Sequence, residues 1–530
     1  MRKNGSKFFL ALAVCWLLVT TQGPAEGAVY RVSNKGNLKG DGSSWSKALQ
    51  NQTFIDTLEK AKPGDEFWIA EGIYIPMILG GGSRRQFSFV VNRGVALYGG
   101  FNGTETKRAQ RDWKKNKTIL SGELQGDNNP VNNSYHVVLI PSTADRTTVV
   151  DGFVITGGYA VDKPEFASGG GLQNQGSPVI ANCVFENNQA KFGGGLYTWN
   201  TPSITNCVFT KNFAVEDGGG MGVNQGSPTV TDCTFSYNRA SGFGGGLSYY
   251  GSKNILLKSS TFISNQSLSK EGGALYISHS KGAVVNSTFF NNSAKLGGGG
   301  IATYKSSPRV VNCTLYKNKS TNEEWGHDMY VGRAPDDGKS LQVQNCILWG
   351  DGGVRLGVSE TGTPAASHCV VQGGLKYGTF IIFGDPQLKN PADNGGPTRT
   401  CAIGQSSSAI DNGEPRLAPK EDQRGMPRPA GKGVDIGAYE EQKPVYYPVS
   451  GSSKTPDFTV GPSKGKPVQK QPTVQPQKPP EKLQPERVKP PASKPSTPVK
   501  PVKPGSKPSV PPVKKPPAVK PPAAKPPGIK

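Results

Sequence analysis

The sequence predicts an all-β chain wound as a right-handed parallel β-helix, and three observations lead to that fold class. A glycine motif ending in Leu, Met or Ile recurs six times, beginning at Gly169, Gly193, Gly218, Gly244, Gly272 and Gly298. A second motif recurs in phase with it, as in Asn206-Cys-Val-Phe209 with Asn212. Units of about 25 residues are too short to bury their own apolar face, so each must stack on its neighbours.

Other repeat folds fit units of this length poorly. There is no room in a unit for a helix of about 10 to 12 residues, and a propeller blade needs four strands in roughly 40 residues. Short alternating strands such as Ser203-Ile-Thr-Asn-Cys-Val-Phe209 are separated by Gly and Asn, which tolerate positive φ. We therefore expect three short strands and three turns in each coil.

Stacked coils about 4.8 Å apart would align equivalent residues in columns along the axis. A large apolar column would point inward, formed by Phe185, Phe209, Phe235, Phe262, Phe289 and Leu315. A column of small inward residues would hold Cys183, Cys207, Cys233, Ser260, Ser287 and Cys313. A third column would lie in a turn, where Asn side chains can bond to one another: Asn182, Asn206, Asp232, Asn286 and Asn312.

Two roles are possible for the cysteines. The seven cysteines after residue 28 leave one thiol unpaired within a single chain, whatever the pairing. Disulfides between coils are possible, but a small buried apolar group is the commoner role for such a thiol. We expect packing rather than cross-linking.

The N-terminal segment, residues 1–28, has the features of a secretory signal peptide. It has a basic start, an apolar run from Phe8 to Val19, and small residues before a plausible cleavage point after Ala28. The alternative is an uncleaved membrane anchor, but this run is shorter than the roughly 20 residues that a span needs. No second apolar stretch reaches that length, so we expect no transmembrane segment in the mature chain.

Residues 29–150 should form an N-terminal cap and the first coils. Within them, Phe54, Leu58 and Ala61 fall at i, i+4 and i+7. This spacing predicts an amphipathic helix whose apolar stripe covers the open end of the first coil.

The rest of the chain divides into a repeat body, a closing segment and a tail. Residues 151–375 should hold the repeats, and 376–442 a C-terminal cap or anchor-associated segment. Residues 443–530 carry 25 of the 44 prolines and +15 of the formal net charge of +22. Because this tail has few aromatic residues and cannot bury a core, we expect it to be disordered or extended. The nearly balanced body and the tail without interleaved aromatics give no reason to expect specific nucleic-acid binding.

The two phased motifs resemble the repeats of chlamydial polymorphic outer membrane proteins and related secreted bacterial β-helix proteins. Residues 42–48, 63–70 and 98–105 are similar to the first segments of such proteins. Residues 394–398, 408–413, 422–425 and 435–440 resemble a choice-of-anchor segment, which precedes surface anchors. The resemblance implies a β-helix fold and export, and it ends before the Pro/Lys tail.

A strip of exposed aromatic residues is the candidate ligand-binding site. If the residue after each glycine motif points inward, the positions one and three further on point outward. Five aromatic residues occupy these positions: Tyr197, Trp199, Tyr250, Tyr276 and Tyr304. Sugar rings could lie on such a platform, because the apolar face of a pyranose packs on an aromatic face. The alternative is that these residues simply suit a β surface or lie under a loop.

Catalytic and metal-binding signals are weaker. Asp217 and Glu271 precede glycine motifs two coils apart, roughly 9.6 Å. That separation is near the upper limit for the two carboxylates of an inverting glycosidase. The scattered histidines predict no metal site, and Asp336-Asp337-Gly338 reads as a loop turn. No cofactor is expected, although resemblance to β-helix lyases would imply calcium if the chain were a lyase.

These observations favour an exported protein of the bacterial cell envelope, surface or exterior that acts in adhesion or glycan binding. Its expected partner is a polysaccharide or a host or cell-surface glycan, with anionic envelope polymers at the basic tail. One alternative is a polysaccharide lyase or glycoside hydrolase. Another is a purely structural envelope protein.

Overall fold

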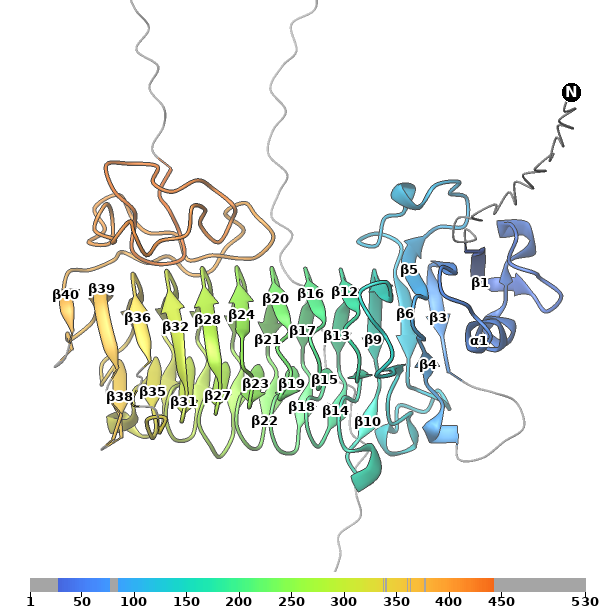
Figure 1. Ribbon diagram of the computed structural model, residues 1–530, viewed down its shortest axis with the longest axis horizontal. Helices are drawn as coiled ribbons and strands as arrows, with labels where there is room; N and C mark the ends of the chain where they lie inside the picture. The colour runs from blue at the N-terminus through green and yellow to red at the C-terminus, as the bar shows by residue number, and fades with distance from the viewer. Residues whose placement is uncertain are drawn as a thin grey trace, which may run out of the picture. The chain divides into compact units, whose positions relative to one another are not determined.

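The computed structural model describes residues 27–76, 84–336, 338, 341–359, 361–362, 364–375 and 378–442. Residues 1–26 of the predicted signal peptide and the whole predicted tail lie outside this range. Parallel strands of the described residues stack into three sheets of a β-helix, and successive coils follow one axis (Figure 1). The predicted fold class is confirmed.

Sheet A has 23 strands in two adjoining files. The first file contains β1 (Val29–Asn37), β2 (Glu66–Ala70), β5 (Ala96–Phe101), β8 (Val149–Asp151), β12 (Val179–Ala181), β16 (Ser203–Thr205), β20 (Thr229–Thr231), β24 (Ile255–Lys258), β28 (Lys281–Val285), β32 (Ser307–Val311), β36 (Gln342–Gln344), β39 (Ala365–Val371) and β40 (Thr379–Ile382). The second contains β3 (Gly72–Tyr74), β6 (Thr118–Ser121), β9 (Phe153–Thr156), β13 (Val184–Glu186), β17 (Val208–Thr210), β21 (Thr234–Ser236), β25 (Thr261–Ile263), β29 (Thr288–Phe290), β33 (Thr314–Tyr316) and β37 (Ile347–Trp349).

Sheets B and C form the other two faces, with 10 and 7 strands. Sheet B contains β4 (Phe89–Val90), β7 (Val138–Ile140), β11 (Leu172–Asn174), β15 (Leu196–Thr198), β19 (Met221–Asn224), β23 (Leu247–Tyr250), β27 (Leu275–Ser278), β31 (Ile301–Tyr304), β35 (Met329–Val331) and β38 (Leu356–Val358). Sheet C contains β10 (Tyr159–Ala160), β14 (Gln189–Ala190), β18 (Phe213–Ala214), β22 (Arg239–Ala240), β26 (Gln266–Ser267), β30 (Ser293–Ala294) and β34 (Lys319–Ser320).

One coil shows how the sequence makes this shape. It runs through β15, β16, β17 and β18, one strand more than predicted. The extra strand arises because Asn206, at φ 53°, bends the sheet A face between β16 and β17. In the glycine motif, Gly193 has φ 60°, and a Cβ on Gly194 would collide with the carbonyl oxygen of Phe213 on the same coil. A side chain at either position would therefore strain the turn.

The inward columns follow the predicted register. Phe185, Phe209, Phe235, Phe262 and Phe289 are fully buried, and their successive rings stack at centroid distances of 4.6 to 4.8 Å. The column of small residues is also buried, and it continues beyond Cys313 to Cys346 and Cys369. All seven described cysteines are free and buried. They act as small packing groups, as expected.

Two amide columns run beside the core. In the turn column, the Nδ2 group of Asn206 donates to Oδ1 of Asn182 over 2.7 Å. A more regular ladder lies deeper, at the last position of the Phe-x-x-Asn motif. There each Nδ2 group donates to the Oδ1 atom of the next coil over 2.9 to 3.1 Å, through Asn188, Asn212, Asn238, Asn265, Asn292 and Asn318.

A single α-helix closes the N-terminal end of the described solenoid. This helix, α1 (Asn51–Glu59), buries Phe54, Ile55 and Leu58, and the Phe54 ring packs on Phe67 and Phe89. Ala61 follows the helix and packs against the same core. Short 3-10 turns lie outside the sheets: η1 (Trp45–Lys47), η2 (Arg84–Gln86), η3 (Arg108–Gln110), η4 (Pro130–Asn132), η5 (Pro164–Phe166) and η6 (Glu323–Trp325).

The closing segment after β40, residues 383–442, runs along the side of sheet A (Figure 1). The Gln423 side chain accepts a hydrogen bond from Thr288 Oγ1 over 2.6 Å and donates one to Thr261 Oγ1 over 2.7 Å. Asn312 donates to the carbonyl oxygen of Asp435, over 3.2 Å. The segment therefore covers turns of several coils laterally.

None of the helices in the described residues is long and apolar enough to cross a membrane.

Candidate functional site

The five predicted aromatic residues all lie on sheet B or directly after one of its strands. Tyr197 and Tyr276 share one column, which also holds Gly222, Ser248 and Ala302. The second column contains Trp199, Tyr250 and Tyr304, separated along the axis by Asn224 and Ser278. The rings of the second column therefore recur at every second coil, roughly 9.6 Å apart.

These residues form separate groups rather than one continuous strip. Tyr197 and Trp199 meet edge to face with ring centroids 4.6 Å apart. Tyr250 and Tyr304, which are 54% and 37% exposed, flank His279 at centroid distances of 5.4 and 5.6 Å. Tyr276 instead stacks on Phe243, 4.2 Å away.

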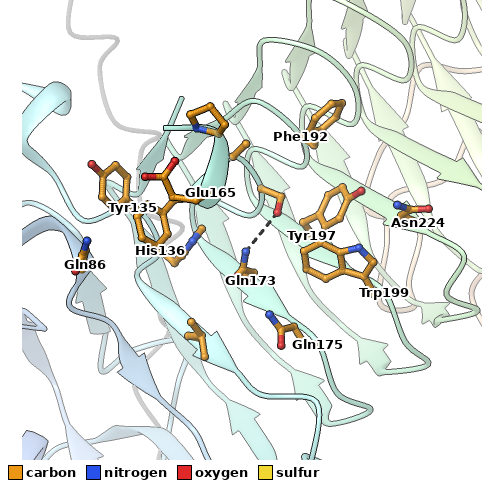
Figure 2. Close-up of a pocket in the computed structure, with 15 residues that line it drawn as sticks. Gln86, Tyr135, His136, Glu165, Gln173, Gln175, Phe192, Tyr197, Trp199 and Asn224 are labelled. Atoms are coloured by element: carbon orange, nitrogen blue, oxygen red, sulfur yellow. Dashed lines mark hydrogen bonds between the residues drawn. The ribbon is translucent and has the colours of Figure 1, made fainter. Parts of the chain in front are cut away.

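The first group forms one wall of a pocket of about 470 Å³. Figure 2 shows Phe192, Tyr197, Trp199 and Asn224 on one side and Tyr135, His136 and Glu165 on the other, with Gln173 and Gln175 between them. The full lining is Gln86, Tyr135, His136, Leu139, Pro164, Glu165, Phe166, Ala167, Ser168, Gln173, Gln175, Phe192, Tyr197, Trp199 and Asn224.

The wall opposite Trp199 is fixed by a cluster around η5. Pro164 suits the first position of this turn, because its φ is preset and it has no N–H to satisfy. Phe166 stacks on Tyr135 at 4.6 Å, and the Arg85 guanidinium covers the same tyrosine at 4.1 Å. Arg85 also pairs with Asp162 over 2.7 Å and donates to the backbone carbonyls of residues 133 and 159. The arginine is thus occupied in holding the wall.

His136 lies at the base of this wall and is 3% exposed. Its Nδ1 atom is 3.0 Å from the carbonyl oxygen of Gly169, so Nδ1 carries the proton and donates it. The Nε2 atom has no partner among the described residues. Burial, the main cause, lowers the pKa of His136 to about 4, so the ring is neutral at neutral pH.

Amide groups supply the polar part of the pocket. Gln173 is largely buried, and its Nε2 group donates to Oγ of Ser168 over 3.4 Å. The Asn224 side chain lies beside the Tyr197 hydroxyl, and its Oδ1 atom is buried without a donor. Burial raises the pKa of Tyr197, so its hydroxyl stays protonated. Aromatic walls with amide and hydroxyl groups between them suit a ligand that has both apolar faces and hydroxyl groups.

The family model for the right handed beta helix region matches residues 127–262, 173–348 and 223–394, which together span just over half of the chain. The chain belongs to this β-helix family. No curated protein matches it.

At least one solved structure supports the β-helix fold. The crystal structure of pectate lyase Pel9A has a TM-score of 0.51 at 14% identity, covering 78% of this β-helix chain and 96% of its own. XylC in complex with xylose has a TM-score of 0.38 at 10% identity, with 78% and 99% of the two chains covered. A rhamnogalacturonan lyase has a TM-score of 0.20 at 10% identity, with 65% and 68% covered. The similarity to the pectate lyase structure shows the fold alone.

The β-helix keeps Asp217 and Glu271 on different coils. The coil between them has Phe243 at the same position, since Gly218 N–H donates to the Phe243 carbonyl and Gly244 N–H to that of Glu271. Asp217 accepts a hydrogen bond from the Phe243 backbone over 2.8 Å, and Glu271 Oε2 has no partner among the described residues. Burial, the largest cause, raises the pKa of both carboxyl groups. Both remain weak catalytic candidates.

The described part of the β-helix contains no cluster of His, Cys, Asp and Glu that could hold a metal ion. Of the predicted loop turn, Asp336 lies 3.8 Å from the Lys305 ammonium, and Asp337 lies outside the described residues.

About half of the residues that line the pocket could not be predicted from the repeats. Gln86, Tyr135, His136, Glu165 and Phe166 lie in the irregular first coils or in η5, outside the phased motifs. One signal does mark the site. Gly169 follows Ala160 by nine positions, whereas Gly193 follows the paired Ala190 by three, so this β-helix coil carries an insertion that includes η5.

Proposed function

We propose that this protein binds a polysaccharide on sheet B, with one sugar unit seated in the Trp199 pocket. The observation that carries the proposal is the pairing of Tyr197, Trp199 and Phe192 with the amides of Gln173, Gln175 and Asn224 in a single cavity. A pyranose presents C–H groups on its faces and hydroxyl groups at its edge. Ring packing and amide hydrogen bonds can therefore act on it at the same time.

The rest of the aromatic column supports a chain lying along the β-helix axis. Trp199, Tyr250 and Tyr304 recur at every second coil, separated by the short side chains of Asn224 and Ser278. In many extended glycans, alternate sugar units present the same face. Such a chain can meet a ring at each second unit while its hydroxyl groups reach the polar residues between.

We propose further that the protein is exported and held at the cell envelope. The features that support this proposal are the apolar N-terminal segment and the +15 tail, which can bind anionic envelope polymers through its lysines. A surface position would bring the sheet B face to polysaccharides outside the cell. Adhesion to a host or cell-surface glycan is the corresponding biological role.

Polysaccharide cleavage is the second candidate, because Glu271 combines a raised pKa with an unpartnered carboxylate oxygen. A carboxyl group of this kind can act as a general acid. A pectate lyase also shares the fold. The formation of unsaturated or reducing-end products from a polysaccharide panel, lost in Glu271→Gln, would establish this activity. Binding without products would leave binding as the function.

The binding proposal predicts that Trp199→Ala lowers affinity for a bound glycan by about tenfold or more, since the variant loses the largest ring contact. Tyr250→Ala and Tyr304→Ala should weaken the binding of long glycans more than that of short ones. These rings would contact sugar units that lie far from the one in the Trp199 pocket. Affinities would be measured by glycan array and calorimetry on the full chain.

A matched control is Tyr237→Asn. Tyr237 is 56% exposed and lies after β21 on sheet A, at φ 55°. Asn187 and Asn291 take the same conformation at the equivalent turn two coils away on either side, so Asn fits the backbone there. This variant should bind as the wild type does. Unchanged affinity in Trp199→Ala would refute the proposed site.

A further inference from the structure

We infer that the sugar unit in the Trp199 pocket is uncharged, and that the pocket rejects a uronate at this position. The inference rests on the proposed polysaccharide function and adds the class of sugar. It follows from the charges and the hydrogen-bonding groups of the lining residues.

Among the side chains that the structure describes, the pocket lining has no cationic group, and its one formally charged residue is Glu165. Glu165 is exposed on η5 and lines the pocket on the side of Tyr135 and His136 (Figure 2). A uronate carboxylate in the pocket would be repelled by Glu165 and would lose water without gaining a counter-charge. Both effects oppose its binding.

Three described basic residues close to lining residues in the sequence or by contact are occupied elsewhere or lie outside the lining. Arg85 contacts Asp162 through both terminal nitrogens and uses its remaining bonds on backbone carbonyls. Lys191 places its ammonium 5.5 Å from the centre of the Phe192 ring. Lys163 precedes η5 and is exposed. None of these three residues lines the pocket.

The buried polar lining atoms that lack a partner among the described residues are hydrogen-bond acceptors. His136 donates through Nδ1 to Gly169, so its unpartnered Nε2 atom is the basic, accepting nitrogen. Asn224 Oδ1 also lacks a donor. Together with the Glu165 carboxylate, these groups match the O–H donors of a neutral sugar. A carboxylate, which only accepts, cannot satisfy them.

The test uses matched oligosaccharides that differ only at the carboxyl group. The probes are mannohexaose against its mannuronate counterpart, and carboxyl-reduced against native hexagalacturonate, together with neutral xylo- and cello-hexaose. Binding to the full chain is measured by calorimetry in 150 mM salt, because salt weakens non-specific attraction by the basic tail. The difference in affinity between the wild type and Trp199→Ala gives the contribution of the pocket to binding.

We expect neutral probes to bind at least about tenfold more tightly than uronates through the pocket. Glu165→Lys should narrow this ratio severalfold by supplying the missing cation. The control Glu59→Lys changes net charge equally, on the exposed side of α1, and should leave the ratio unchanged.

The outcomes separate the two proposals. Uronates that bind as tightly as neutral probes, and lose affinity in Trp199→Ala, would overturn the neutral-sugar inference while supporting glycan binding. The absence of any glycan binding that depends on Trp199 would overturn both. An unchanged ratio in Glu165→Lys would show that Glu165 does not select the ligand, which also contradicts the inference.

Discussion

His136 lines the pocket and also affects the stability of the fold. The ring is buried beside Phe166, whose centroid is 6.0 Å away, and among the described residues it hydrogen-bonds to the backbone of the first glycine motif. Protonation would place a charge in an apolar site without a counter-ion. The depressed pKa of this residue is the direct result.

This residue should make the protein less stable in mild acid. The folded pKa of about 4 lies below the ordinary value of 6.5, so the unfolded state binds the proton first as pH falls. The stabilisation is complete above about pH 6.5 and is lost progressively down to about pH 4, on the order of 3 kcal/mol in total. Urea unfolding at pH 7 and pH 4.5 would measure it.

The comparison variant is His136→Gln, which keeps a donor for Gly169 but cannot titrate. Its free energy of unfolding should fall less than that of the wild type between these two pH values. Equal losses in both proteins would mean that other groups cause the acid sensitivity. If the variant folds poorly, an NMR titration of the His136 imidazole in the wild-type protein would measure its pKa directly.

At the scale of the element, the amide ladder ties each coil to the next. Asn238 accepts from both the backbone N–H and the Nδ2 group of Asn212. It also donates to the Phe209 carbonyl over 2.8 Å and to Asn265 over 2.9 Å. Every polar atom of this buried side chain therefore has a partner on the coil on one side or the other.

Asn238→Ala should reduce the free energy of unfolding by at least about 2 kcal/mol, because it leaves several buried groups of the adjoining coils without partners. Chemical denaturation would measure the loss. Asn254→Ala, at an exposed turn position, should change stability by less than about 0.5 kcal/mol. Similar effects of the two substitutions would show that the ladder contributes little.

The repeat elements could be predicted because each residue's environment recurs in the next coil. Phe235 lies between Phe209 and Phe262 in space as well as in the motif pattern, so periodicity alone identifies its neighbours. Trp199 could be placed outside for the same reason. Tyr135 and Glu165 could not be assigned to the pocket, because they come from non-repeating segments whose contacts depend on the tertiary path.

The aromatic residues of sheet B illustrate a further limit of prediction from the sequence. Alternation along a strand predicts that Tyr276 faces outward, and it leaves the ring's neighbours undetermined. In the structure Tyr276 packs on Phe243 and is half-buried, whereas Tyr250 is exposed. The difference depends on the turn before each glycine motif, where the side chains vary from coil to coil.

At the scale of the whole molecule, the formal charge and the binding face belong to different parts of the sequence. The +15 tail accounts for most of the net charge, whereas the described side chains that line the pocket include no cation. Attachment and recognition should therefore be separable by truncation.

A chain that ends at Gln442 should lose its association with the cell envelope and keep its glycan affinity in moderate salt. Cell fractionation of full-length and truncated protein, together with calorimetry of both, would measure the two properties. Equal retention in the envelope fraction would rule out the tail as the tether. A parallel loss of glycan affinity would show that the tail takes part in recognition.

The closing segment is tied to itself and to several coils of the solenoid by buried polar contacts. Arg428 and Glu440 form a fully buried pair 2.8 Å apart, and the Glu440 backbone donates to Asp422. Gly437 donates to Asn345, and Gln423 joins the segment to coils more than a hundred residues earlier in the chain. If the tail is the tether, tension pulling on residue 442 first loads these cross-links in shear. The segment would then distribute the force over several coils, so that the last coil would not unfold before the others.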